Sequence, residues 1–172
     1  MSTDSPILHS ITHDRFLADV QTLARSIEAD DWTPDIVVGV GRGGLVPAVY
    51  LSHRLDRPML SIDYSSASAD AALADVAARS AAGTRLLIVD DINDSGGTIA
   101  ALRRRLADRG GDARYLRFAV LLDNRRSGQS VDYWVDRIDR DTDKRWFVFP
   151  WEALATQQAI VDEALSVPDR LA

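Results

Sequence analysis

The sequence predicts an α/β fold in which helices flank a parallel sheet. Three observations predict it. Short, continuous apolar runs are typical of strands that are buried on both faces, and stretches with helical spacing of apolar residues separate them. Two glycine-rich segments, 39–44 and 95–97, lie at the C-terminal ends of two expected strands. Ligands bind at this end of the strands in α/β sheets. The apolar runs lie at 35–40, 58–64, 86–90 and 113–123.

The elements follow one another regularly along the chain. A helix is expected over 13–29, because Phe16, Val20 and Leu23 fall on one helical face. A second helix is expected over 44–55, where Pro47 is tolerable in the first turn. A further helix over 98–110 follows the third apolar run. The expected helices at 44–55 and 98–110 each follow an expected strand, which is the pattern of a parallel sheet.

Composition limits the classes of protein. A chain of 172 residues with 46% hydrophobic residues is long enough for one buried domain, expected to span 1–172. The absence of cysteine excludes disulfides, thiolate zinc sites and thiol catalysis. A net charge of −6 argues against nucleic acid as a partner. No apolar run approaches the ~20 residues that span a bilayer, and no secretory signal is evident. We therefore expect a cytoplasmic protein without a membrane partner.

Three carboxylates stand beside a glycine turn in the segment 86–98. Asp90 and Asp91 follow the third apolar run, and Asp94 opens the turn that leads into a helix. Free backbone N–H groups and the helix dipole favour a phosphate at such a turn. Carboxylates so close together raise one another's pKa unless a ligand or cation neutralises them. An acidic helix cap explains one of the three acids, whereas a phosphorylated sugar with adjacent hydroxyls accounts for all of them.

Three motifs resemble those of a known family. The segment LLIVDDINDSGGT, at 86–98, resembles the signature with which type I phosphoribosyltransferases bind 5-phosphoribosyl 1-pyrophosphate (PRPP). The segment VGVGRGGLVPA, at 38–48, resembles the family's pyrophosphate loop. The segment WFVFPWE, at 146–152, resembles the base-binding end of the members that act on 6-oxopurines. These motifs occur in the family's order.

The resemblance implies an architecture and an assembly. It implies a Rossmann-like parallel sheet within a core of about 14–123 and a small hood built from the C-terminal segment, about 124–155. A flexible loop, about 64–84, would close over PRPP, with Tyr64 and Ser65 near its base. A solvated helical hairpin is the other interpretation of this segment, and a mobile helical lid would satisfy both. The resemblance also implies a homodimer or homotetramer.

The resemblance also implies roles for individual residues around PRPP. Asp90 and Asp91 would hold the ribose hydroxyls, directly or through the expected cofactor, Mg²⁺. Asp94 would be the catalytic residue, facing the base near N7 as proton acceptor or donor. The pyrophosphate loop often carries a non-proline cis peptide in this family. The residues expected around the 5-phosphate are Ser95, Gly96, Gly97 and Thr98, and those expected around the pyrophosphate are Arg42, Gly43 and Gly44.

The base-binding residues follow the family only in part. Trp146 would stack on the purine and the backbone of Phe147 would read the edge of its ring, although core packing is the other interpretation of Trp146. Many members that act on 6-oxopurines place a lysine at the end of the fourth strand, and none occurs here between 118 and 128. Asn124 could donate a neutral hydrogen bond in its place. Alternatively, Arg125 or Arg126 could donate a charged one.

The sequence thus leaves three functions to weigh. The favoured one is an enzyme that transfers phosphoribosyl from PRPP to a purine base, expected to be a 6-oxopurine, and releases pyrophosphate. The second is a PRPP-binding regulatory protein with little or no catalysis. The third is a phosphosugar-binding module or a relative of the pyrophosphokinases. The presence of both Asp94 and Trp146 favours the enzyme.

Overall fold

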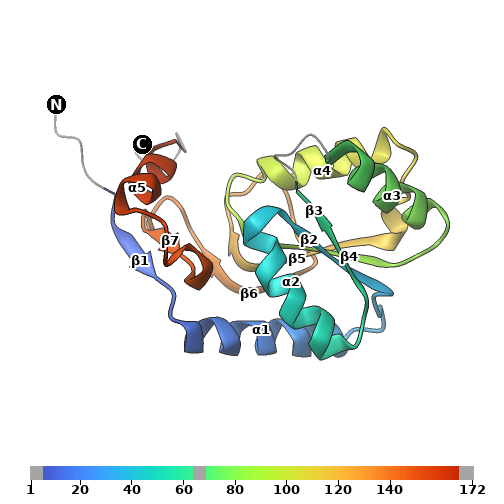
Figure 1. Ribbon diagram of the computed structural model, residues 1–172, viewed down its shortest axis with the longest axis horizontal. Helices are drawn as coiled ribbons and strands as arrows, with labels where there is room; N and C mark the ends of the chain where they lie inside the picture. Colours follow the sequence, from blue (N-terminus) through green and yellow to red (C-terminus); the bar gives the residue numbers. More distant parts are fainter. Residues whose placement is uncertain (1–5, 64–68, 167–172) are drawn as a thin grey trace.

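A parallel sheet forms the centre of the molecule. The computed structural model describes residues 6–63 and 69–166. Within them, five parallel strands run in the order β3-β2-β4-β5-β6, which confirms the predicted fold class (Figure 1). The strands are β2 (Ile36–Val40), β3 (Met59–Ile62), β4 (Leu86–Asn93), β5 (Leu116–Asn124) and β6 (Tyr133–Ile138).

Helices cover both faces of this sheet. In Figure 1, α1 (His13–Glu28) and α2 (Gly41–Leu55) lie on one side, and α3 (Ala69–Ala81) and α4 (Gly97–Ala107) lie on the other. Alternate residues of β4 supply the two cores: Leu87 packs with the first pair of helices and Ile88 with the second. None of the described helices combines the length and apolar character needed to cross a membrane.

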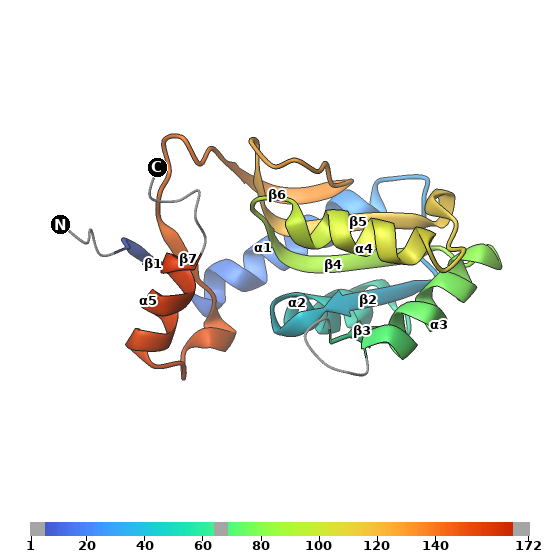
Figure 2. The same cartoon turned by 90° about the horizontal axis from the view of Figure 1, so that it is seen from above.

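A second, smaller unit forms the hood. Its strand β7 (Trp146–Val148) pairs in parallel with the N-terminal strand β1 (Leu8–Ser10). A 3₁₀ turn (Pro150–Glu152) and α5 (Gln157–Leu165) follow, and Figures 1 and 2 show them beside the main sheet. The hood therefore includes an N-terminal strand and extends to α5. Residues 133–138, placed in the hood by the sequence, form β6 of the main sheet instead.

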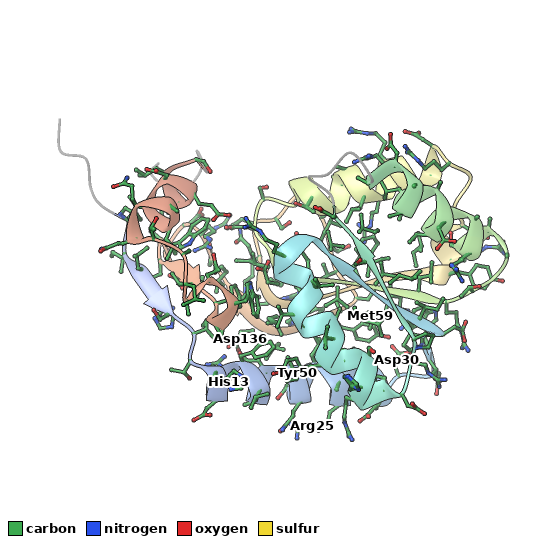
Figure 3. The ribbon with its side chains drawn as sticks, viewed as in Figure 1. His13, Arg25, Asp30, Tyr50, Met59 and Asp136 are labelled. Atoms are coloured by element: carbon green, nitrogen blue, oxygen red, sulfur yellow. The ribbon has the colours of Figure 1, made fainter. Side chains whose placement is uncertain are left out.

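Aromatic rings join the hood to the core. Phe16 on α1 is buried, and its ring meets Trp151 of the hood edge-on, with centroids 5.3 Å apart. The ring of Tyr50, which is labelled in Figure 3 between α1 and α2, also meets the Phe16 ring, with centroids 5.1 Å apart. Trp151 stacks in turn on Phe149 at 4.7 Å. Because such ring pairs add to the energy of burial, this cluster holds the hood against α1.

The segment expected as a flexible loop is mostly a packed helix. Residues 69–81 form α3, in which Leu73, Val76 and Ala77 are buried against the sheet. Residues 69–81 therefore follow the helical alternative rather than the loop, although one face of this helix is buried instead of solvated. Leu73, Val76 and Ala77 recur at i, i+3 and i+4. This spacing is enough to bury one face of the helix. The expected contacts of Tyr64 and Ser65 lie outside the described residues.

Candidate active site

A cavity of about 910 Å³ lies between the hood and the carboxyl ends of β2 and β4. Its walls come from the loop after β2, the end of β4, the turn before α4 and the hood. Most residues that the sequence singled out line it, although they come from three separate motifs. They are Arg42, Gly43, Asp90, Asp91, Asp94, Ser95, Gly96, Gly97, Thr98 and Trp146. Gly44, Asn124 and Phe147 are not among the described residues of its walls.

The turn before α4 has the geometry of an anion site. Gly96 has φ +86° and precedes the first residue of α4, Gly97. A side chain at Gly96 would be strained at this φ, and its Cβ would lie 2.7 Å from Ser127 Oγ. The backbone N–H of Gly128 also donates to Ser95 O at 3.2 Å. The turn is thus held by the neighbouring segment. Gly97 N–H donates to Ser95 Oγ at 3.2 Å, and the N-terminus of α4 faces the cavity.

The glycine loop after β2 forms the opposite wall. A Cβ on Gly43 would lie 2.3 Å from Asp91 Oδ2, so only glycine lets this backbone lie beside that carboxylate. Gly44 also has a packing role, while its predicted contact with pyrophosphate stays a prediction. It is buried, and a Cβ there would lie 2.1 Å from Val89 O, so it lets α2 pack on β4. The described residues contain no cis peptide bond, in this loop or elsewhere.

Asp90 and Asp91 are an adjacent, half-buried pair within β4 that lines the cavity. The Asp91 N–H donates to Asp90 Oδ1 at 3.0 Å, and the Ile92 N–H donates to Asp91 Oδ1 at 2.7 Å. Burial, followed by the charge of Asp91, raises the pKa of Asp90 well above its usual value. Burial, with Glu152 and Glu163 nearby, raises the pKa of Asp91 to about 7. Two carboxylates in this state favour a bound cation.

The raised pKa of Asp91 leads to a prediction about stability. Between the unfolded value of about 4 and the folded value of about 7, the native state binds more protons than the unfolded state. Stability therefore falls as pH rises through this range. We expect Asp91→Asn to raise the melting temperature of the ligand-free protein at pH 8 and to change it little at pH 4. Scanning calorimetry at both pH values measures this.

The exposed Asp75 on α3 provides the matched control. Asp75→Asn should shift the melting temperature by a similar small amount at the two pH values, because its partner Arg79 is also exposed. If the gain from Asp91→Asn were the same at pH 4 and pH 8, the burial of an ionised Asp91 would not be its cause.

Asp94 is paired with an arginine that the sequence did not single out. Arg140 Nε donates to Asp94 Oδ1 at 2.9 Å and Arg140 Nη2 donates to Oδ2 at 3.0 Å, in a two-pronged ion pair. Arg140 is 5% exposed. Its surroundings in the sequence, RIDRDTDKR at 137–145, are typical of a solvated charged turn. No local pattern could have distinguished Arg140 from its neighbours.

Asn124 ends β5, the strand position from which it was expected to contact the base, but it does not line the cavity. Its Nδ2 donates to Asp94 O at 3.0 Å, and its Oδ1 accepts from the N–H groups of Arg126 and Arg140 at 3.1 and 3.3 Å. The buried amide is committed to backbone groups, so it supports the loop of Asp94 instead of reading a base. Arg125 lines a separate hollow of about 500 Å³, and Arg126 pairs with Asp139 and Asp141.

The hood contributes one aromatic wall and one backbone edge. Trp146 lines the cavity, while the side chain of Phe147 is buried edge-on against His9. Trp146 N–H donates to Ile7 O, and Val148 O accepts from Ile11. Because successive residues of a strand alternate in direction, the N–H and C=O of Phe147 face the other edge of β7. The backbone N–H and C=O of Phe147 therefore point away from β1. The predicted contact of this backbone with the edge of the base needs this orientation.

Several cavity residues were missed by the sequence analysis. They lie on the hood beyond the Trp146 motif or at its end. Glu152 caps the 3₁₀ turn, accepting from Phe149 N–H at 2.7 Å, and burial raises its pKa. The spacing of apolar residues at 157–165 indicates a helix, but no sequence signal shows that this helix covers the cavity. The missed residues include Trp151, Glu152, Ile160 and Glu163.

Comparisons with known proteins agree with this geometry. Residues 9–156 match the model of the phosphoribosyl transferase domain. The chain is 30% identical over 124 residues to a xanthine-guanine phosphoribosyltransferase of Nitratidesulfovibrio vulgaris strain Hildenborough, covering 68% of each chain. It resembles the crystal structure of a purine phosphoribosyltransferase from Pyrococcus horikoshii, with a TM-score of 0.63 and 27% identity over 86% of this chain and 96% of that one. The structure of a Helicobacter pylori xanthine-guanine-hypoxanthine phosphoribosyltransferase is similar in fold, with a TM-score of 0.63 and 22% identity over 84% and 92%. The three motifs meet in one cavity, and the family model and the relatives agree with them. The chain therefore belongs to the type I phosphoribosyltransferase family.

Proposed function

We propose that this chain transfers the 5-phosphoribosyl group of PRPP to a purine base, releases pyrophosphate and forms a nucleoside monophosphate. The single observation that carries the proposal is the composition of the cavity. It combines an anion-binding turn, a half-buried pair of carboxylates, the carboxylate of Asp94 and the indole of Trp146. The relative from Nitratidesulfovibrio, named for xanthine and guanine, supports a 6-oxopurine as the base.

Each wall matches one part of the reactants. The first turn of α4 binds the 5-phosphate through N–H groups of the 95–98 segment. Arg42 and the Gly43 N–H bind the pyrophosphate, whose departure needs fixed positive charge. Asp90 and Asp91 accept hydrogen bonds from the ribose hydroxyls. The C1′–O bond to pyrophosphate breaks with its electron pair leaving on that oxygen, while N9 of the base forms the new bond to C1′.

The residues present fit a magnesium ion. Asp90 and Asp91 are two adjacent, half-buried carboxylates in the cavity, and no group of three or more acids or histidines among the described residues is arranged to hold a metal by itself. This matches Mg²⁺, which prefers one or two carboxylates together with substrate oxygens and water. When bound, the ion would neutralise the negative charge that develops on the leaving pyrophosphate. The expected homodimer or homotetramer and the cytoplasmic location stay predictions.

The proposal is tested by measuring pyrophosphate release. Wild-type protein, PRPP and Mg²⁺ are mixed in turn with hypoxanthine, guanine, xanthine and adenine. We expect release with at least one 6-oxopurine and little with adenine. Release with adenine or a pyrimidine alone would overturn the choice of base. Tight PRPP binding by calorimetry without turnover on any base would favour the regulatory protein instead.

Replacing Trp146 tests the base-binding half of the cavity. Loss of one aromatic–base stack costs about 1–3 kcal/mol, so Trp146→Ala should raise the KM for the base by roughly 5- to 100-fold. The affinity for PRPP should change little. Trp134→Ala is the matched control, because Trp134 is partly exposed on β6 beside Arg137, away from the cavity. Equal effects of the two substitutions would show that Trp146 only packs.

A further inference from the structure

The ion pair between Arg140 and Asp94 has a consequence for the transfer step. Asp94 lines the cavity, whereas Arg140 lies behind it and is almost wholly buried. We infer that Arg140 is a positioning residue, which holds the carboxylate of Asp94 in one orientation towards the imidazole edge of the base. This inference rests on the proposed function, since it assigns how one residue of that site is held.

The contacts of Arg140 are those of a fixed support. Both oxygens of Asp94 accept from it, through Nε and Nη2. Its Nη1 donates to Asp143 O at 3.1 Å and to Arg145 O at 2.7 Å. Four of the five guanidinium N–H groups are thus engaged. A planar, two-pronged pair of this kind fixes the direction of the carboxylate as well as its charge.

The same guanidinium joins Asp94 to the base-stacking wall. Arg145 immediately precedes Trp146, so the carbonyl that Arg140 holds belongs to the start of β7. The guanidinium also lies 5.3 Å from the centre of the Phe147 ring. One side chain thus binds both the carboxylate that follows β4 and the backbone carbonyl that precedes Trp146. A base stacked on Trp146 would therefore meet Asp94 in a constant geometry.

The pairing also restricts what Asp94 does chemically. An ionised carboxylate that is already paired is a hydrogen-bond acceptor only. It suits a base that presents an N–H at N7 and a lone pair at N9. As N9 bonds to C1′ and pyrophosphate leaves with the electron pair of the C1′–O bond, the N7 proton stays hydrogen-bonded to Asp94 and is then released through it to water.

A double-mutant cycle tests the inference. Arg140→Gln, Asp94→Asn and the double variant are compared with wild type by steady-state kinetics. If Arg140 acts through Asp94, Arg140→Gln should lower kcat by roughly 10- to 100-fold, with the KM for PRPP almost unchanged. In the Asp94→Asn background the same substitution should add less than about a twofold further loss, because coupled sites are not additive. Arg140→Lys, which keeps the charge, should restore part of kcat.

Arg137→Gln is the matched control. Arg137 also pairs with a buried carboxylate, Asp123, at 3.1 Å, and lines the smaller hollow rather than the 910 Å³ cavity. Its kcat should stay near that of wild type.

Each outcome decides the matter. Unchanged kcat in Arg140→Gln, or an equal loss with and without Asp94, would overturn the inference. If Arg140→Gln fails to fold because Asp94 is left buried without its partner, the cycle is run with Arg140→Lys, and additivity there overturns it as well. A wild-type protein that transfers to no purine would overturn the proposed function, and this inference with it. Active wild type with additive variants would overturn the inference alone.

Discussion

Removing divalent cations should abolish the transfer reaction. We expect pyrophosphate release to fall below detection after treatment with excess EDTA and to return when Mg²⁺ or Mn²⁺ is added. The reason is the pair of Asp90 and Asp91, whose pKa values are raised by burial and by neighbouring carboxylates. Without a cation, these carboxylates would face an anionic substrate in a cavity that Glu152 and Glu163 also line. Like charges in such surroundings repel strongly.

The chelation experiment has a clear control and a clear contrary result. Thermal unfolding of the protein in EDTA should match that in plain buffer, because no described cluster of side chains holds a metal by itself. A lower melting temperature in EDTA would point to a structural ion instead. Full activity after exhaustive chelation would refute the role proposed for Asp90 and Asp91.

Asp94→Asn should have the next largest effect. General acid–base groups typically contribute 10²- to 10⁴-fold, and we expect kcat to fall by at least about 10²-fold. Calorimetry should show PRPP binding close to that of wild type, because the turn that binds the 5-phosphate is held by other contacts, such as Gly128 N–H to Ser95 O. The substitution removes one charge of the pair with Arg140, so some loss of stability is also expected.

A second buried carboxylate separates catalysis from stability. Asp123 accepts from Asn93 Nδ2 at 2.8 Å and pairs with Arg137, but it lines the smaller hollow rather than the 910 Å³ cavity. Asp123→Asn should lower the melting temperature much as Asp94→Asn does, while kcat stays near the wild-type value. Equal losses of kcat in the two variants would show that Asp94 acts through folding. Unchanged turnover in Asp94→Asn would remove it from the chemistry altogether.

The parts of the site that were predicted correctly are those encoded by a short segment. The apolar run of β4, its two acids and the turn at Gly96 lie within residues 86–98. Each depends on neighbours a few positions away, through strand burial, helix capping and backbone φ. The loop prediction did not hold for residues 69–81 because this segment is rich in alanine and has few large apolar side chains. It forms a buried helix because it packs against the sheet.

The sequence by itself determined the parallel sheet, the glycine turn before α4 and the identity of the carboxylates, because strand burial, turn geometry and charge density are local properties. Only the tertiary structure decided how the site is supported. Asp94 and Arg140 are 46 positions apart in the sequence. Strand β1 lies near the N-terminus and pairs with β7, and α5, which follows β7 in the sequence, lines the cavity. Asn124 donates a hydrogen bond to the backbone of Asp94 because β5 ends beside that loop. These contacts form between segments that are distant in the sequence and come together only when the sheet and the hood pack. No short segment of sequence contains that information.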